Sequence, residues 1–104
     1  MQIINRNLLD KFKQKHPQSR KPLSDWANII NSTDYQDLNV LKITFAKKVD
    51  YLPQGYTVFD IGGNKYRLVT EIEYCFKVVE IKVVWTHNEY SNPKNKTDLR
   101  NGNI

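Results

Sequence analysis

The chain has 104 residues, with 16 Lys and Arg against 11 Asp and Glu and a net charge of +5. This length is typical of one domain and is sufficient to bury a core without disulfides or structural metals. No apolar run approaches the roughly 18 residues that span a membrane, so a transmembrane protein is not expected, and the positive charge favours polyanionic partners such as nucleic acids without identifying one.

Two short helices are predicted for the first third of the chain. A short strand is expected at residues 2–4, and the helix after it ends at Pro17, because proline cannot continue a helix. The second helix begins near Pro22, which suits a first turn. In both segments apolar side chains recur on one helical face, which predicts that each helix packs against a sheet. These side chains are Leu8, Leu9 and Phe12 in the first segment and Leu23, Trp26, Ala27 and Ile30 in the second.

Residues 33–55 give a mixed pattern. Leu38, Leu41 and Phe45 have helical spacing, whereas Leu41, Ile43 and Phe45 alternate as they would in a strand. Both interpretations remain open for this segment.

From residue 56 onward the apolar period becomes two, which predicts three strands at residues 56–61, 65–74 and 78–87. The glycine-rich turn at residues 62–64 supplies the positive backbone angles that a tight hairpin needs. Two closely connected strand pairs make an antiparallel meander. The chain is therefore expected to have an α+β fold, with two amino-terminal helices packed on an antiparallel sheet.

The closing residues 92–104 are polar and contain almost no apolar side chains. Such a segment buries little surface, so a flexible carboxy-terminal tail is predicted for it. The folded domain is accordingly expected to comprise residues 1–91.

Two basic residues stand at the start of the second predicted strand. Because alternate residues of a strand face opposite ways, Tyr66 and Leu68 are expected in the core, and Lys65 and Arg67 on a solvent-exposed face. The preceding glycines lack side chains and allow a bulky partner to approach this end of the strand. In the structural alternative, these cations only pair with glutamates of the same sheet.

His87 and Tyr90 are predicted to lie near Lys65 and Arg67. The reason is that the end of the third strand neighbours the start of the second in an antiparallel pair. Basic groups that hold a phosphate, with a His or Tyr that passes a proton, are the groups required to cleave RNA by its own 2′-hydroxyl. A histidine at the end of a strand is also commonly structural, so this alternative stands beside the chemical one.

The run VFDIGGNKYRLVTEIEY, followed by IKVVWTHNEY, resembles the signature of HigB-type toxins of type II toxin–antitoxin systems, in which a GGNKYRL hairpin precedes a THxEY ending. Pro17, Leu23, Trp26 and the segment 35–38 lie where that family has comparable residues, so the resemblance covers roughly residues 1–91. The family is a branch of the RelE-like ribonucleases, and the resemblance implies a RelE-like α+β fold.

What the resemblance implies about function is a ribosome-dependent endoribonuclease, an mRNA interferase, which cuts translated mRNA and inhibits translation until an antitoxin neutralises it. It implies an enzyme that needs neither a metal nor another cofactor. It also implies two kinds of partner, mRNA on the ribosome and a cognate HigA-type antitoxin with a helix-turn-helix domain. The toxin–antitoxin complex would bind operator DNA through that antitoxin.

The resemblance also assigns roles to individual residues. Arg67 and Lys65 would hold the scissile phosphate and stabilise the pentavalent phosphorane, since cations aimed at developing charge are usually the largest catalytic contribution. His87 or Tyr90 would transfer the proton, although a tyrosine could instead stack on a base. Asn64 matches the hairpin motif and is a candidate for RNA binding, with a purely structural turn residue as the alternative.

Lys47 and Lys48 are further candidates for RNA binding, because related ribonucleases use lysines from comparable regions. The alternative is a solvated surface pair. Members of the family often have Asp after the Tyr of the ending, whereas Ser91 follows Tyr90 here, so no carboxylate role is assigned at that position.

The cysteine content and the amino terminus predict the compartment. Cys75 is the single cysteine and cannot form an internal disulfide, and no cysteine–histidine spacing typical of a zinc site occurs. The residues MQIINRNLLDKFKQ reach charged side chains too early for a signal peptide. A cytoplasmic protein without membrane association is therefore expected.

Two other functions compete with the toxin hypothesis. A non-catalytic RNA- or DNA-binding module of the same basic α+β fold would use these cations and aromatic groups only to hold a nucleic-acid backbone. A structural interaction protein would instead surround Arg67 and His87 with apolar side chains and paired partners.

Overall fold

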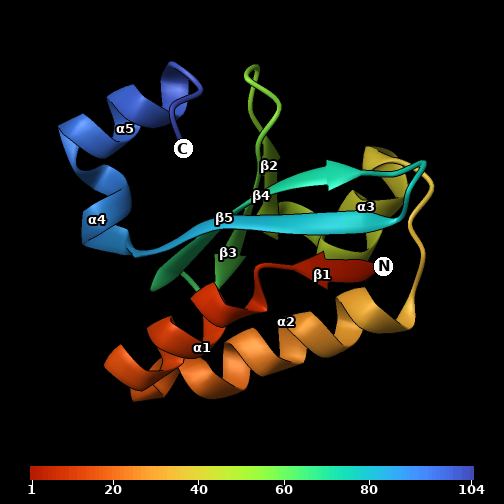
Figure 1. Cartoon of the computed structure of the whole chain (residues 1–104), viewed down its shortest axis with the longest axis horizontal. Coiled ribbons are helices and arrows are strands. Elements are labelled where there is room, and N and C mark those ends of the chain that lie inside the picture. The colour runs from red at the N-terminus through yellow and green to blue at the C-terminus, as the bar shows by residue number, and fades with distance from the viewer.

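A five-stranded sheet forms the centre of the molecule and separates two layers of helices (Figure 1). The computed structural model describes the backbone of all 104 residues and every side chain except that of Lys47. Across the sheet the strands follow the order β1 (Gln2–Ile4), β5 (Val78–Thr86), β4 (Tyr66–Glu73), β3 (Thr57–Ile61) and β2 (Val49–Tyr51). β1 pairs with β5 in parallel, and the other neighbours are antiparallel. The predicted α+β class and the antiparallel meander are confirmed.

The helices of the larger layer come from the first half of the chain. They are α1 (Arg6–Lys15), α2 (Arg20–Ser32) and α3 (Leu38–Phe45), with the short 3-10 turns η1 (Pro17–Ser19) and η2 (Ala46–Lys48). The apolar stripes predicted for α1 and α2 are buried in one cluster with the sheet, which confirms that these helices pack on it. The buried stripe residues are Leu9, Phe12, Leu23, Trp26, Ala27 and Ile30.

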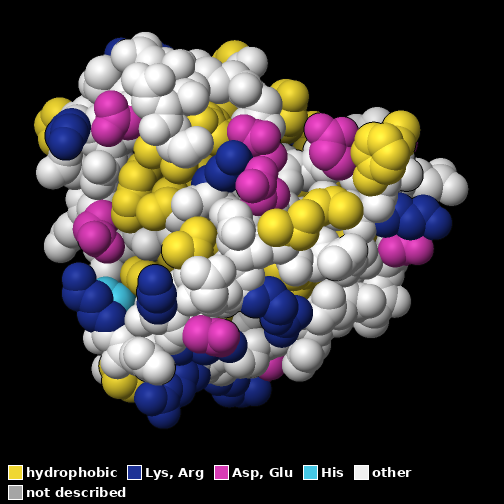
Figure 2. Space-filling view, in the orientation of Figure 1, with side chains coloured by type: hydrophobic (Ala, Val, Ile, Leu, Met, Phe, Trp, Pro, Cys, Tyr) yellow, Lys and Arg dark blue, Asp and Glu magenta, His cyan; other side chains and the backbone are white. Residues whose placement is uncertain are grey.

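The opposite sides of α1 and α2 face the solvent and carry much of the positive charge. Figure 2 shows Lys and Arg side chains gathered over this layer, at the lower edge of the view. Among the residues that the structure describes, no helix combines the length and the apolar character that crossing a membrane requires.

α3 lies in the segment whose sequence pattern is mixed. The Asp37 carboxylate accepts a hydrogen bond from the Val40 backbone N–H at 3.0 Å, which satisfies one of the unpaired amides in the first turn of the helix. Leu41 is fully buried, whereas Ile43 is 81% exposed. The helical interpretation is therefore the correct one for residues 38–45. The strand of this segment is β2, which follows α3 and η2 and lies at the edge of the sheet.

A bulge in β5 changes which residues face each layer of helices. The pairing with β4 omits Lys82, because Val69 pairs with Val83 and Thr70 pairs with Ile81. Ile81 consequently joins the core on the side of α1 and α2, while Val83 packs on the opposite face. Strict alternation along this strand, expected from the sequence, is wrong at the bulge.

The carboxy-terminal segment differs from the flexible tail expected for residues 92–104. The short helix α4 (His87–Ser91) is followed by α5 (Pro93–Arg100). The Asn92 side chain accepts a hydrogen bond from the Lys94 backbone N–H at 2.9 Å, and Pro93 occupies the first turn of α5. An Asn cap followed by Pro is a helix-start signal that the polar composition of the segment obscured.

α5 covers the second face of the sheet through one leucine. Leu99 is 4% exposed and belongs to an apolar cluster whose other buried members are Tyr56, Val58, Val69 and Trp85. Because this cluster covers β4, the face predicted to be exposed is in fact buried, and Val69 has no exposed surface. The prediction of a solvent-exposed face is wrong at this end of the strand.

Replacing Leu99 with alanine is expected to lower the free energy of unfolding by about 2–5 kcal/mol, because it removes buried methyl groups and leaves a cavity under α5. Urea unfolding of the variant and the parent measures the difference. Lys94→Ala in the same helix is the control, since Lys94 is exposed. Equal stabilities of Leu99→Ala and Lys94→Ala would show that α5 does not pack on the sheet.

Candidate active site

The hairpin between β3 and β4 sets the position of Arg67. Gly62 and Gly63 have φ angles of 62° and 72°, which L-residues with side chains adopt only with strain. The turn at residues 62–65 places Asp60 opposite Arg67 in the antiparallel ladder. The sequence DIGGNKYR therefore brings an acid and a base into contact across the hairpin.

Arg67 is only 9% exposed, and its charge is compensated on several sides. Its Nε lies 3.1 Å from Asp60 Oδ1. Its Nη1 donates to the backbone oxygens of Tyr66 and Asn64 at 3.2 and 3.4 Å, and its Nη2 donates to Asn64 Oδ1. The Tyr90 ring centroid lies 5.4 Å from Cζ, within cation–π range. Since a guanidinium has five N–H donors, at least one remains for a ligand.

Asp60 is the point at which the charged groups of this region meet. Its side chain is 25% exposed, and burial raises its pKa above the ordinary value by more than the charge of Arg67 lowers it. Asp50 adds to the rise, whereas His87 and Lys48 act to lower the pKa of Asp60. Asp60 is therefore influenced by one other acid, an arginine, a histidine and a lysine, and of these Arg67 contacts it directly.

His87 is held beside the hairpin turn by its backbone. Its N–H donates to the Lys65 carbonyl oxygen at 2.8 Å, and both side chains are exposed. The prediction had His87 ending a strand, but the structure makes it the first residue of α4. Thr86 and Glu89 form a capping box around it: Glu89 N–H donates to Thr86 Oγ1 at 3.2 Å, and Thr86 N–H donates to Glu89 Oε1 at 2.9 Å.

Tyr90 lies one turn further along α4 and links the site to the apolar cluster under α5. Its ring is 6.3 Å from that of Trp85, and Lys96 Nζ lies 5.5 Å from the ring centroid. Burial raises the pKa of Tyr90, and the charge of Asp50 adds to this rise, while Arg67 opposes it. A phenol is protonated at neutral pH, and this rise makes Tyr90 harder still to deprotonate, which suits a hydrogen-bond donor or a stacking surface rather than a general base.

The structure brings together the four residues proposed for catalysis, Lys65, Arg67, His87 and Tyr90, and adds Lys48 nearby through its influence on Asp60. The side chain of Lys47 lies outside the described residues. Asn64 uses its amide oxygen to hold Arg67, so in this structure it supports the arginine. Among the described side chains, no group of three or more His, Cys, Asp or Glu lies close enough together to hold a metal ion.

Asp60 and Asp50 are functional candidates that sequence reasoning missed. A signal was available for Asp60, because counting back from the turn at residues 62–65 pairs it with Arg67. Asp50 gave no such signal, since it lies in β2, within the segment whose pattern was mixed. Lys96 was also missed, because its position beside Tyr90 depends on α5.

Comparisons with known proteins identify a family and several relatives of this chain. Residues 19–92 match the HigB toxin family, described as the RelE-like toxic component of a toxin–antitoxin system. The chain is 30% identical over 92 residues to "mRNA interferase toxin HigB" of Escherichia coli K12 and to "mRNA interferase HigB" of Shigella flexneri. It is 24% identical over 91 residues to "mRNA interferase HigB" of Escherichia coli O6:H1. Each alignment covers 86% of this chain and 88% of the relative.

Replacing Arg67 with alanine is expected to raise the pKa of Asp60 further. Burial already raises this pKa, and the substitution removes the cation that opposes the rise. Carboxyl carbon NMR titration of the parent and the variant measures the shift. Lys65→Ala serves as the control, because Lys65 is exposed and does not touch the carboxylate. A lower Asp60 pKa in Arg67→Ala would show that the charge of Arg67 does not act on Asp60 as described.

Proposed function

The chain belongs to the HigB toxin family, the RelE-like toxic components of toxin–antitoxin systems, and we propose that it is an endoribonuclease that cuts mRNA during translation on the ribosome. The observation that carries the proposal is the clustering of Arg67, Lys65, His87 and Tyr90 around one hairpin turn. Relatives named mRNA interferases favour this activity over a non-catalytic nucleic-acid-binding module.

The reaction that suits these groups is an attack by the RNA's own 2′-hydroxyl. The 2′-oxygen forms a bond to the adjacent phosphorus, and the bond from phosphorus to the 5′-oxygen of the next nucleotide breaks. One proton leaves the 2′-hydroxyl, and one is delivered to the departing 5′-oxygen. Arg67 and Lys65 stabilise the extra negative charge of the phosphorane, so the residues themselves supply the charge stabilisation and no metal ion is required.

The two proton-bearing side chains are suited to different tasks. His87 is exposed and free to meet the substrate, and an imidazole can both accept and donate a proton. Tyr90 is protonated at neutral pH, as an ordinary tyrosine is, and burial raises its pKa further. We assign proton transfer to His87, and assign to Tyr90 either proton donation to the leaving oxygen or stacking on a base.

Phosphate binding is supported by the arrangement around Arg67. The guanidinium is fixed by Asp60 and Asn64 before any substrate arrives, so little entropy is lost when its remaining donor meets a phosphate oxygen. Lys48 and Lys65 add positive charge at the solvent-exposed edge of the same region, and they are proposed to bind the RNA backbone.

An antitoxin and mRNA are the partners that follow from membership of the family. We propose in addition that the antitoxin is of the HigA type, carries a helix-turn-helix domain, and takes the complex to operator DNA.

Arg67→Ala and His87→Gln are each expected to reduce mRNA cleavage about a hundred- to a thousandfold, the usual effect of losing one preorganised group at a charged transition state. Each variant would be induced in cells without antitoxin, and growth and message integrity would be measured. Arg20→Ala and His16→Gln are matched controls, since they remove the same residue types from α2 and from the residue before η1. The His16 ring lies beside Phe12, which belongs to the apolar cluster on the side of α1 and α2, whereas Tyr90 packs on the opposite cluster.

Folding must be separated from activity, because Arg67→Ala leaves Asp60 without its partner. Melting temperature and antitoxin binding of each variant report the fold. Arg67→Ala combined with Asp60→Asn removes both charges and is expected to restore stability but not cleavage. Full toxicity of the double variant and of His87→Gln would place the reaction elsewhere on the protein.

The RNA fragments are expected to carry 2′,3′-cyclic phosphate and 5′-hydroxyl ends, because the 2′-oxygen is the nucleophile. Ligation-based end analysis of cleaved messages distinguishes these ends from 3′-hydroxyl and 5′-phosphate ends. The second pair would mean that water attacks the phosphorus, contrary to the proposed chemistry. A message with a single 2′-deoxy nucleotide at a mapped cleavage site is expected to resist cutting there.

A further inference from the structure

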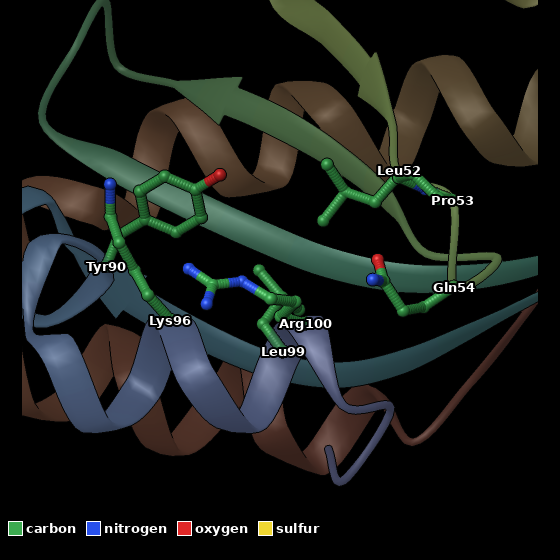
Figure 3. Close-up of a pocket in the computed structure, with 7 residues that line it drawn as sticks. All are labelled: Leu52, Pro53, Gln54, Tyr90, Lys96, Leu99 and Arg100. Carbon is green, nitrogen blue, oxygen red and sulfur yellow. The ribbon is translucent and has the colours of Figure 1, made fainter.

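A cavity of about 300 Å³ opens beside Tyr90, between α5 and the turn that joins β2 to β3 (Figure 3). Tyr90 is one of its walls. Leu52 and Gln54 enter from the turn, and Lys96 and Arg100 come from α5. Figure 3 shows the Arg100 guanidinium pointing toward the Tyr90 ring, with Leu52 on the opposite side of the cavity.

The lining combines apolar surface with positive charge. Leu52 and Leu99 supply aliphatic surface, and Tyr90 supplies an aromatic ring. Lys96 and Arg100 are its two cations, and no acidic side chain is among its described lining residues. A ligand that matches this lining is flat and apolar in one part and anionic in another, as a nucleotide is.

The cavity is continuous with the candidate active site through a single side chain. Arg67 Cζ lies 5.4 Å from the Tyr90 ring centroid, and Lys96 Nζ lies 5.5 Å from the same centroid. An RNA strand whose phosphate contacts Arg67 therefore reaches Lys96 as soon as it passes Tyr90. Lys96 is then positioned for the next phosphate along the strand, and the cavity for the base attached to it.

We propose that this cavity is a subsite for the ribonucleotide adjacent to the scissile phosphate. Its base packs between Leu52 and the Arg100 guanidinium, and Lys96 neutralises its phosphate. The inference rests on the proposed RNA cleavage and adds to it a place where the sequence flanking the cut is selected. Arg100 and Lys96 are specificity-determining residues in this arrangement, and they take no part in the bond changes at phosphorus.

Binding is tested with a short RNA that carries 2′-O-methyl groups throughout, which blocks the attacking hydroxyl. Methyl NMR signals of Leu52 and Leu99 are expected to shift as this RNA is added to the parent protein. Lys96→Ala and Arg100→Ala are each expected to weaken binding at least about fivefold, the lower range for losing one base or phosphate contact. Lys94→Ala is the matched control, because Lys94 lies on the same helix and is not part of the cavity.

Cleavage sites in cells supply the second readout. Messages cut by Lys96→Ala and Arg100→Ala are expected to show an altered distribution of cut positions, whereas Lys94→Ala cuts as the parent does. RNA binding and cut positions that are identical in Lys96→Ala and Lys94→Ala would overturn the subsite. A loss of antitoxin binding alone in Lys96→Ala would overturn it as well, since the cavity would then be a protein-docking surface.

The two proposals fail in different ways. A parent protein that cuts no message, yet binds the methylated RNA through Leu52, Leu99 and Lys96, would refute the cleavage proposal and leave a nucleotide-binding cavity in place. A parent protein that cuts messages, with binding and cut positions insensitive to Lys96 and Arg100, would refute the cavity alone.

Discussion

The burial of one charged side chain organises the functional end of this protein. An arginine that is 9% exposed is stable only if its charge and its N–H groups find partners within the fold. The hairpin register supplies these partners, because a turn over residues 62–65 sets Asp60 opposite Arg67 and leaves Asn64 within reach of the guanidinium. The glycines of the turn therefore allow the hairpin register that sets Asp60 opposite Arg67, since residues with side chains adopt the φ angles of these glycines only with strain.

In the THNEY sequence, some residues fix the backbone conformation and others lie at the candidate active site. Thr86 and Glu89 form the capping box, which starts α4 directly after β5. That fixed start places His87 at the mouth of the hairpin and Tyr90 one turn later against Arg67. The spacing of the histidine and the tyrosine consequently follows from helix geometry, in which residues three apart lie on neighbouring positions of one face. Thr86 and Glu89 therefore act on the backbone, and they contribute to the site by fixing the positions of His87 and Tyr90.

The elements that sequence reasoning predicted well depend on local patterns. The stripes of α1 and α2 are visible because each helix buries one face against the sheet, and β3 and β4 are visible because they are rich in β-branched and aromatic residues. Two features depended on distant contacts and were not predicted. α5 is a polar helix that packs on the sheet through Leu99. A single buried residue makes no periodic pattern, so the helix could not be predicted from periodicity. Arg67 is enclosed by Asp60 and Asn64 of the hairpin and by Tyr90 of α4, so an alternation that correctly placed Tyr66 in the core wrongly placed Arg67 in solvent.

The environment of the candidate site residues also depends on a segment outside the family match. The match ends at residue 92, and α5 begins at Pro93. Yet the apolar cluster that Leu99 completes lies beneath Tyr90, whose pKa is raised by burial, and α5 also contributes Lys96 to the same ring. Low dielectric surroundings strengthen the interaction of a cation with a phosphate and keep a phenol protonated. Relatives that have the same hairpin and THxEY ending but differ after it would thus place the proposed site residues in different electrostatic surroundings, and the proposed RNA cleavage would then differ in rate and in the sequence that is cut.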